Sequence, residues 1–176
     1  NKFGQSKVIY NSLVKLKETN NFDQIKNRIL DKEILEMQHR GISLQKNDQE
    51  EFNKISEKLG KLSTDFSNNV LDATNKWFLI LNKKSEVDGL PERVLELMAI
   101  SAHNHLKKDE EVDIKNGPWK LSLDIPTYTS FMTYATDRNL REKLYKAFVG
   151  RASQGENNNS QIIEEILSLR TKQANL

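Results

Sequence analysis

Residues 119–153, "WKLSLDIPTYTSFMTYATDRNLREKLYKAFVGRAS", contain one strand pattern followed by two helix patterns. Trp119, Leu121 and Leu123 alternate with polar residues, which is the period of two expected of a strand with one buried face. Pro126 then opens a helical segment, because proline is well tolerated in the first turn of a helix. The stretch predicts helices arranged around one short strand.

Capping patterns mark the starts of further helices. Asn139 is followed three residues later by Glu142, and Asn21 is followed three residues later by Gln24. An N-cap side chain followed at this spacing by Glu or Gln is typical of a capping box, which satisfies the free N–H groups of the first turn. Gly41 stands where the helix that begins after Asn21 should end, since glycine is favoured just past a helix C-terminus.

The longest predicted helix begins at Asp48 and continues to Ile80. Its apolar residues recur three or four positions apart: Phe52, Ile55, Leu59, Leu62, Phe66, Val70, Ala73, Trp77 and Ile80. At 1.5 Å per residue this stripe is about 45 Å long, and a stripe of that length needs a partner helix. We expect the first two helices of the chain to pack antiparallel against it.

These patterns predict a mainly α fold, a helical bundle with long antiparallel helices and one short β-strand or small hairpin. A polar connection ends in Asn116, Gly117 and Pro118, a combination typical of a turn. We therefore predict two domains, a helical domain over residues 1–116 and a strand with helices over residues 117–176.

Composition excludes several classes of function. The chain has 27 Lys and Arg against 25 Asp and Glu, a net charge of +2, so no general attraction to nucleic acid or anionic membrane is expected. It has no cysteine, which removes disulfides, thiol catalysis and thiolate metal sites. No apolar run approaches the roughly 18 residues of a membrane span. These features predict a cytoplasmic protein.

The three histidines do not form a metal-binding pattern. His103 and His105 lie two positions apart in a predicted helix, so their side chains point to nearly opposite sides, and no HExxH motif occurs. His39 lies in the predicted last turn of a helix, where a basic side chain is favourable.

Acidic side chains do not form a recognisable site either. Glu164 and Glu165 are adjacent, and adjacent helical residues diverge by about 100°. Asp109, Glu110, Glu111 and Asp113 lack the spacing and the glycine of an EF-hand, so a solvated loop is expected. We predict no catalytic, substrate-binding or metal-binding residue within this chain.

A longer pattern begins at residue 117, "GPWKLSLDIPTYTSFMTYATDRNLREKLYKAFVGRAS", and continues in "NNNSQIIEEILSLRTKQANL". It resembles the thimet oligopeptidase and oligopeptidase A family of zinc metallopeptidases, in which a strand and a proline-started helix precede the pattern LRExxYxAxxxRAS. The matching positions are Leu140, Arg141, Glu142, Tyr145, Ala147, Arg151, Ala152, Ser153, Asn157 and Ile166 to Arg170. "FSNNVLDATNKW" and "GLP" match more loosely, so the resemblance covers roughly residues 45–176.

The resemblance implies a mostly helical, two-lobed enzyme that hydrolyses short peptides in a deep, narrow channel. Its zinc would be held by the two histidines of HExxH and a later glutamate, and the motif's own glutamate would activate the zinc-bound water. All these residues lie downstream of Leu176 in the family. The chain is therefore expected to be the N-terminal, non-catalytic portion, with an N-terminal segment also missing before Asn1. Its expected partners are peptide substrates and the missing catalytic lobe.

Arg141 and Arg151 are two charged residues of the family pattern. The interpretation favoured here is scaffold packing: Arg141 meets Tyr145 one turn later, and Arg151 ties a helix end or a neighbouring carboxylate with its planar guanidinium. Direct contact of either arginine with substrate is the alternative.

A free-standing helical interaction module without enzymatic activity is the alternative function for the whole chain. The strand Trp119–Asp124 argues against such a module, because the chain offers it no obvious partner and it is expected to be an edge or an orphan. Ile166 and Leu169 are expected to be left exposed in the fragment, which would allow self-association.

Overall fold

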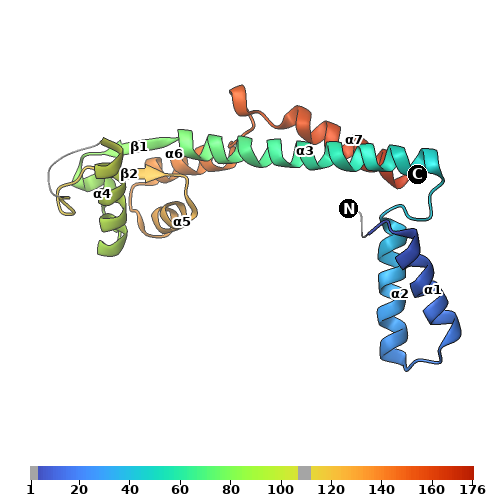
Figure 1. Cartoon of the computed structure of the whole chain (residues 1–176). Helices are drawn as coiled ribbons and strands as arrows, with labels where there is room; N and C mark the ends of the chain where they lie inside the picture. Colours follow the sequence, from blue (N-terminus) through green and yellow to red (C-terminus); the bar gives the residue numbers. More distant parts are fainter. Residues whose placement is uncertain (1–3, 107–111) are drawn as a thin grey trace. The chain divides into compact units, whose positions relative to one another are not determined.

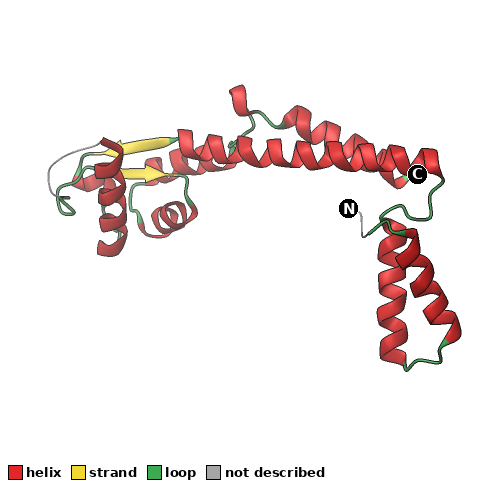
Figure 2. Ribbon diagram, in the orientation of Figure 1, coloured by secondary structure: helices red, strands yellow, loops and turns green. Residues whose placement is uncertain are grey.

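The computed structural model describes residues 4–106 and 112–176, and most of these residues are helical (Figures 1 and 2). In chain order the helices and strands are α1 (Lys7–Thr19), α2 (Gln24–His39), α3 (Lys46–Lys76), β1 (Phe78–Leu81), α4 (Glu92–Leu106), β2 (Trp119–Ser122), α5 (Ile125–Tyr134), α6 (Arg138–Val149) and α7 (Ser160–Ala174). Short 3-10 helices cover Lys84–Val87 and Gly155–Asn157. The predicted mainly α class is confirmed.

The described residues form two compact units. The first contains the residues up to Leu62 together with Glu165–Leu176, and the second contains Ser63–Glu164. The long helix α3 and the last helix α7 each contribute residues to both units. The predicted boundary between residues 116 and 117 concerns the lobes of a longer protein and stays a prediction.

In the first unit, α1 and α2 pack against each other as a helical hairpin. The predicted N-cap of α2 is wrong: Asp23, not Asn21, accepts a hydrogen bond of 2.9 Å from the Lys26 backbone N–H. Asp23 directly precedes the first helical residue, so its short carboxylate reaches that N–H group. Gly41 follows α2 with φ +82°, a conformation that favours glycine.

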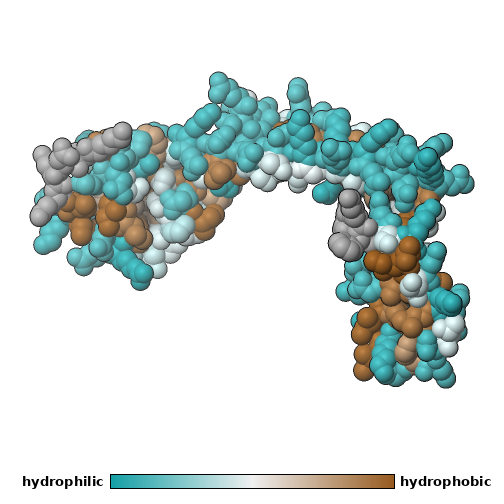
Figure 3. All heavy atoms as spheres, in the orientation of Figure 1, coloured by the Kyte–Doolittle hydropathy of each residue, from teal (hydrophilic) through white to brown (hydrophobic). Residues whose placement is uncertain are grey.

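The surface of this hairpin is partly apolar. Val8 on α1 is 77% exposed and Ile25 on α2 is 73% exposed. Figure 3 shows apolar side chains gathered at the surface of these two helices.

The predicted packing of the α3 stripe against the first two helices is wrong. In the first unit, side chains of α7 face α3 through the pairs Lys58–Glu165, Glu51–Lys172 and Ser56–Gln173. Only Ile55 and Leu62 of α3 are fully buried. Apolar periodicity indicates that a helix needs a partner, but it does not identify which helix of the chain supplies one.

The last turn predicted for the long helix is also wrong. The helix α3 ends at Lys76, and Phe78–Leu81 forms the strand β1. A short apolar run fits a helix stripe and a buried strand equally well, and here the pairing with β2 decides between them.

The strands β1 and β2 pair in antiparallel register, with Phe78 opposite Ser122 and Leu81 opposite Trp119. The strand β2 is therefore not an orphan, although each strand of this two-stranded sheet keeps one unpaired edge among the described residues. Because α4 lies between β1 and β2 in the sequence, the sheet is not a hairpin.

The core of the second unit forms around β2. The predicted alternation is confirmed, since Trp119, Leu121 and Leu123 are each at most 1% exposed. Helices α4 and α5 pack on this strand. The buried cluster consists of Leu81, Val87, Leu90, Met98, Ala99, Trp119, Leu121, Leu123, Phe131, Ala135 and Leu144.

Aspartate caps begin the two helices that follow β2. Asp124 accepts a hydrogen bond of 3.0 Å from the Thr127 backbone N–H at the start of α5. Asp137 accepts hydrogen bonds from the backbone N–H groups of Asn139 and Leu140 at the start of α6. The predicted cap at Asn139 is therefore wrong, because the helix begins at Arg138, two residues earlier than the capping-box pattern indicated.

The Asp124 cap should make stability depend on pH. Burial favours a higher pKa for this carboxyl, but hydrogen bonds from the Ser122 hydroxyl and the Thr127 N–H outweigh it, so its pKa lies below the usual value. A lowered folded-state pKa stabilises the fold above the unfolded-state pKa of about 4, and this contribution is lost as the pH falls through the folded-state pKa.

We therefore expect Asp124→Ala to lower the free energy of unfolding by about 1 kcal/mol at pH 7, and by much less at about pH 2. Urea unfolding at both pH values, followed by circular dichroism, measures the change. Asp124→Asn is the matched control, since it keeps a capping oxygen without the charge. A loss of equal size at both pH values would contradict the role of the carboxylate.

Candidate functional site

A hydrogen bond between backbone groups stabilises the connection between α6 and α7, residues 150–159. Ala152 lies in this connection with φ +52° and is 7% exposed. The left-handed conformation costs a non-glycine residue about 1–2 kcal/mol, so surrounding contacts must hold it. One such contact is the hydrogen bond of 2.8 Å from the Asn159 N–H to the Ala152 carbonyl.

Asn159 also joins the connection to α3. Its side chain is 2% exposed and donates a hydrogen bond of 3.1 Å to the Phe66 carbonyl. Its side-chain oxygen accepts a hydrogen bond of 2.8 Å from the Asn69 amide. The buried amide is therefore satisfied on both sides, as a buried polar group must be to avoid a large desolvation cost.

Arg151 is held at the end of α6. Its Nε donates a hydrogen bond of 2.8 Å to the Phe148 carbonyl, and its guanidinium carbon lies 3.6 Å from the centroid of the Phe148 ring. The Phe148 ring in turn stacks on Tyr128, with ring centroids 3.7 Å apart. The prediction that Arg151 ties a helix end is confirmed.

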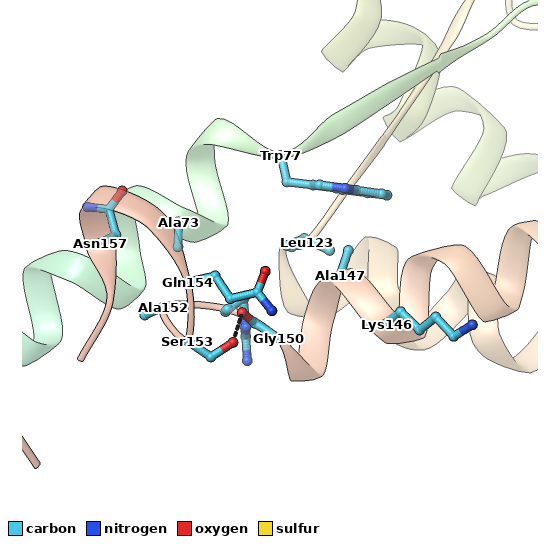
Figure 4. Close-up of a pocket in the computed structure, with 11 residues that line it drawn as sticks. Ala73, Trp77, Leu123, Lys146, Ala147, Gly150, Ala152, Ser153, Gln154 and Asn157 are labelled. Atoms are coloured by element: carbon cyan, nitrogen blue, oxygen red, sulfur yellow. Dashed lines mark hydrogen bonds between the residues drawn. The ribbon is translucent and has the colours of Figure 1, made fainter. Parts of the chain in front are cut away.

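A pocket of about 400 Å³ opens beside Arg151 (Figure 4). Its lining residues come from α3, from the residue that joins α3 to β1, from the residue after β2, from α6 and from the connection: Ala73, Trp77, Leu123, Lys146, Ala147, Gly150, Arg151, Ala152, Ser153, Gln154 and Asn157. Figure 4 shows Trp77, Leu123 and Ala147 near one another, with Ser153 and Gln154 on the connection. The lining combines an apolar wall with polar and cationic groups.

Arg141 serves the packing of α5 against α6. Its Nη1 donates a hydrogen bond to the Ala135 carbonyl at the end of α5. Tyr145 is 49% exposed, and its predicted contact with Arg141 stays a prediction. Glu142 forms an ion pair of 2.6 Å with Lys146, and this hydrogen-bonded cation holds the pKa of Glu142 below its usual value.

The histidines lie where the sequence placed them. His39 is in the last turn of α2, and His103 and His105 are in the last turn of α4. The His105 ring lies with its centroid 4.3 Å from that of Phe78, and its Nδ1 is 3.4 Å from the Lys120 ammonium.

Two of the acidic residues that the sequence singled out, Glu165 and Asp113, make local contacts. Glu165 pairs with Lys58. Asp113 accepts hydrogen bonds from the Asn116 side chain and from backbone N–H groups, chiefly that of Asn116, which together lower its pKa. Asp109, Glu110 and Glu111 lie outside the described residues. Within residues 4–106 and 112–176, no three His, Cys, Asp or Glu side chains lie close enough together to hold a metal ion.

Two features of this region were not predicted from the sequence. Asn159 lies in "NNNS", where three consecutive asparagines give no indication of which side chain is buried. The stacking of Arg151 on Phe148 has a signal that could have been used, because the two residues are three positions apart and a cation three residues after an aromatic side chain can reach its ring.

Comparison with known proteins identifies relatives along almost the whole chain. The chain is 41% identical over 178 residues to the "Probable cytosolic oligopeptidase A" of Arabidopsis thaliana, an alignment that covers 99% of this chain and 25% of the relative. It is 41% identical to the "Organellar oligopeptidase A, chloroplastic/mitochondrial" of the same plant, covering 22% of that protein. It is 34% identical to the "Oligopeptidase A" of Escherichia coli (strain K12), with 98% and 25% covered.

The family model described as Peptidase family M3 matches residues 131–176, the part that contains α6, the connection and α7. The chain spans about a quarter of the length of these relatives. In the described parts of the chain, no helix combines the length and the apolar character needed to cross a membrane. By sequence, the chain is similar to oligopeptidase A proteins along almost its whole length, and its residues 131–176 match Peptidase family M3.

Proposed function

We propose that this chain forms the N-terminal, non-catalytic portion of a zinc-dependent oligopeptidase that hydrolyses short peptides inside a deep channel. The observation that carries the proposal is the similarity to oligopeptidase A proteins along almost the whole chain. The sequence itself contains no HExxH motif, so the zinc ligands and the catalytic glutamate of such an enzyme must come from outside these 176 residues.

The polar side chains of the described residues support a structural role for this portion. Asp23, Asp124 and Asp137 cap helices, and Asn159 joins two segments of the second unit. We infer that the chain forms part of the helical wall around the catalytic zinc. We further infer that the enzyme is cytoplasmic.

The pairing of β2 with β1 removes one argument against the alternative function. A free-standing interaction module is no longer disfavoured by an orphan strand, because the chain supplies the partner strand itself. Sequencing of the coding region downstream of Leu176 separates the two functions. An HExxH motif in the same frame supports the oligopeptidase, and a stop codon directly after Leu176 supports the module.

The isolated chain should bind no stoichiometric zinc and cleave no peptide. Metal-stripped protein is dialysed against zinc and analysed for metal, and a mixture of peptides of five to fifteen residues is incubated with it and examined by mass spectrometry. One tightly held zinc per chain, or cleavage that a chelator abolishes, would contradict the non-catalytic role.

A chimera tests the positive part of the proposal. The segment of the Arabidopsis cytosolic relative that aligns with this chain is replaced by these 176 residues. We expect the chimera to retain zinc and to hydrolyse short peptides, because the replaced segment would supply wall and not ligands. The relative lacking this segment is the control. A chimera that folds and binds zinc but is no more active than the control would contradict the proposal.

A further inference from the structure

We propose that the pocket beside Arg151 is a binding site for a carboxylate group that carries an apolar neighbour. The proposal goes beyond the role of the chain as a wall, because it assigns a ligand class to a pocket within the second unit. It rests on the hydrogen-bond donors of the Arg151 guanidinium, on the positive charge of the pocket lining and on the apolar residues of that lining.

The guanidinium of Arg151 is held in place and still has donor groups that a ligand could accept from. Its Nε is bound to the Phe148 carbonyl, and its flat face rests on the Phe148 ring. Both contacts restrain the side chain and lower the entropy cost of binding a ligand. The two Nη groups remain as donors at the edge of the guanidinium, and such a planar pair of donors matches the two oxygens of a carboxylate.

The pocket has positive charge that its own lining does not neutralise. The described lining residues include Lys146 and Arg151 and no aspartate or glutamate. Lys146 is already paired with Glu142. Across the described residues, no carboxylate forms an ion pair with Arg151. A partly buried cation without a counterion favours an anionic ligand.

The apolar part of the pocket lining favours an organic ligand over a small inorganic anion. Trp77, Leu123 and Ala147 contribute apolar surface, and the volume of about 400 Å³ falls in the range of small-molecule sites. A carboxylate on Arg151 would place the attached side chain toward this surface. Two sources offer this chemistry, the free C-terminus of a peptide and an acidic side chain of a protein segment.

The site can be tested on the isolated chain by nuclear magnetic resonance. Protein labelled with nitrogen-15 is titrated with N-acetyl-leucine, which has a free carboxylate, and with N-acetyl-leucinamide, which does not. We expect N-acetyl-leucine to shift the Trp77 indole N–H and the amides of residues 150–154 with a dissociation constant on the order of 1 mM, as suits a small ligand with one charged contact. The leucinamide should cause no saturable shift.

A third probe identifies the source of the carboxylate. N-acetyl-glutamic acid α-amide has only a side-chain carboxylate. Tighter binding of N-acetyl-leucine supports the site and assigns it to a peptide C-terminus. Tighter binding of the glutamic acid amide supports the site and assigns it to an acidic side chain of a protein segment.

Variants separate the site from general effects of charge and folding. Arg151→Gln should weaken binding of the preferred probe about tenfold or more, because a charge-assisted hydrogen-bonded pair is lost. Arg93→Gln on α4, where the side chain is exposed, removes the same charge and should change binding less than twofold. Ala73→Leu fills the pocket while leaving Arg151 in place, so it should also abolish saturable shifts even if Arg151→Gln does not fold.

Equal binding of N-acetyl-leucine and its amide, saturable shifts that lie outside the pocket, or full binding by Ala73→Leu would overturn the proposal. So would the absence of saturable shifts with both carboxylate probes at 20 times the expected dissociation constant, which is about 20 mM. These results concern this chain alone, so failure of the site is distinguishable from failure of the chimera to cleave peptides.

Discussion

Trp119→Ala should lower the free energy of unfolding by about 3–5 kcal/mol, the range observed when a large aromatic side chain is deleted from a core. The Trp119 side chain is 1% exposed and packs within the core cluster of the second unit. Its indole N–H donates a hydrogen bond of 3.1 Å to the Ile114 carbonyl, which the variant would leave without that donor. Urea unfolding followed by far-ultraviolet circular dichroism measures the loss.

The second tryptophan of the chain provides a matched control. Trp77 is half-buried at the edge of the same core and lines the pocket beside Arg151. Trp77→Ala deletes the same indole and should cost about 1–2 kcal/mol, since this side chain is only partly buried. If both variants lose the same free energy, the core is not centred on β2.

The strand β2 was predictable because its pattern is local. Trp119, Leu121 and Leu123 face one side at a period of two, and any strand with these residues would bury that side. The partner strand was not predictable in the same way. Phe78–Leu81 is a short apolar run directly after a helix, and only its pairing with β2, some forty residues later in the sequence, makes it a strand.

For the helices too, local sequence predicts that a helix forms, whereas residues far away in the sequence decide which helix it packs against. The periodicity of α3 correctly indicated a long helix in need of a partner, and the predicted partner was wrong because α7 lies beside the first half of α3. The expectation that Ile166 and Leu169 are left exposed is therefore wrong, because both are half-buried. The exposed apolar residues of α7 are instead Ile163 and Leu167, at 45% and 59%. Which helices meet is decided by the whole chain, and no single segment encodes it.

The pocket beside Arg151 was only partly predictable. The anchoring of Arg151 at a helix end followed from its position after α6 and from the properties of its guanidinium. The pocket itself joins α3, the residues that follow α3 and β2, α6 and the connection, which are far apart in sequence. Its lining therefore depends on tertiary structure that periodicity does not contain.

Asn159 provides the other large expected effect. Asn159→Ala should lower the free energy of unfolding by about 2–3 kcal/mol, because the Phe66 carbonyl and the Asn69 amide each lose a partner in a buried region. Asn69→Ala should cost about 1 kcal/mol, since it removes one of these two hydrogen bonds. The double variant should lose less than the sum of the two, because Asn69 has no bond to Asn159 left to lose. Strict additivity would contradict the hydrogen bond between them.

A charge at this position gives a sharper test than deletion. Asn159→Asp keeps the shape of the side chain, but the carboxylate has no donor for the Phe66 carbonyl and places a negative charge beside it in a buried site. We expect a loss of about 3 kcal/mol or more at pH 7, the cost of an uncompensated buried charge. Protonation restores a donor, so the folded state should bind this proton more tightly than the unfolded state. Stability of the variant should therefore fall as the pH rises above about 4.

Asn68→Asp makes the same chemical change one residue before Asn69 on α3, where the side chain is exposed, and should change stability by less than about 0.5 kcal/mol at either pH. Urea unfolding of both variants at about pH 4 and at pH 7 gives the comparison. An exposed position for residue 159 would predict nearly equal, small losses at the two pH values, because water would solvate the carboxylate. A loss that grows with pH in Asn159→Asp and not in Asn68→Asp is the result expected if residue 159 is buried between the connection and α3, where the Phe66 carbonyl needs a donor and a carboxylate supplies none.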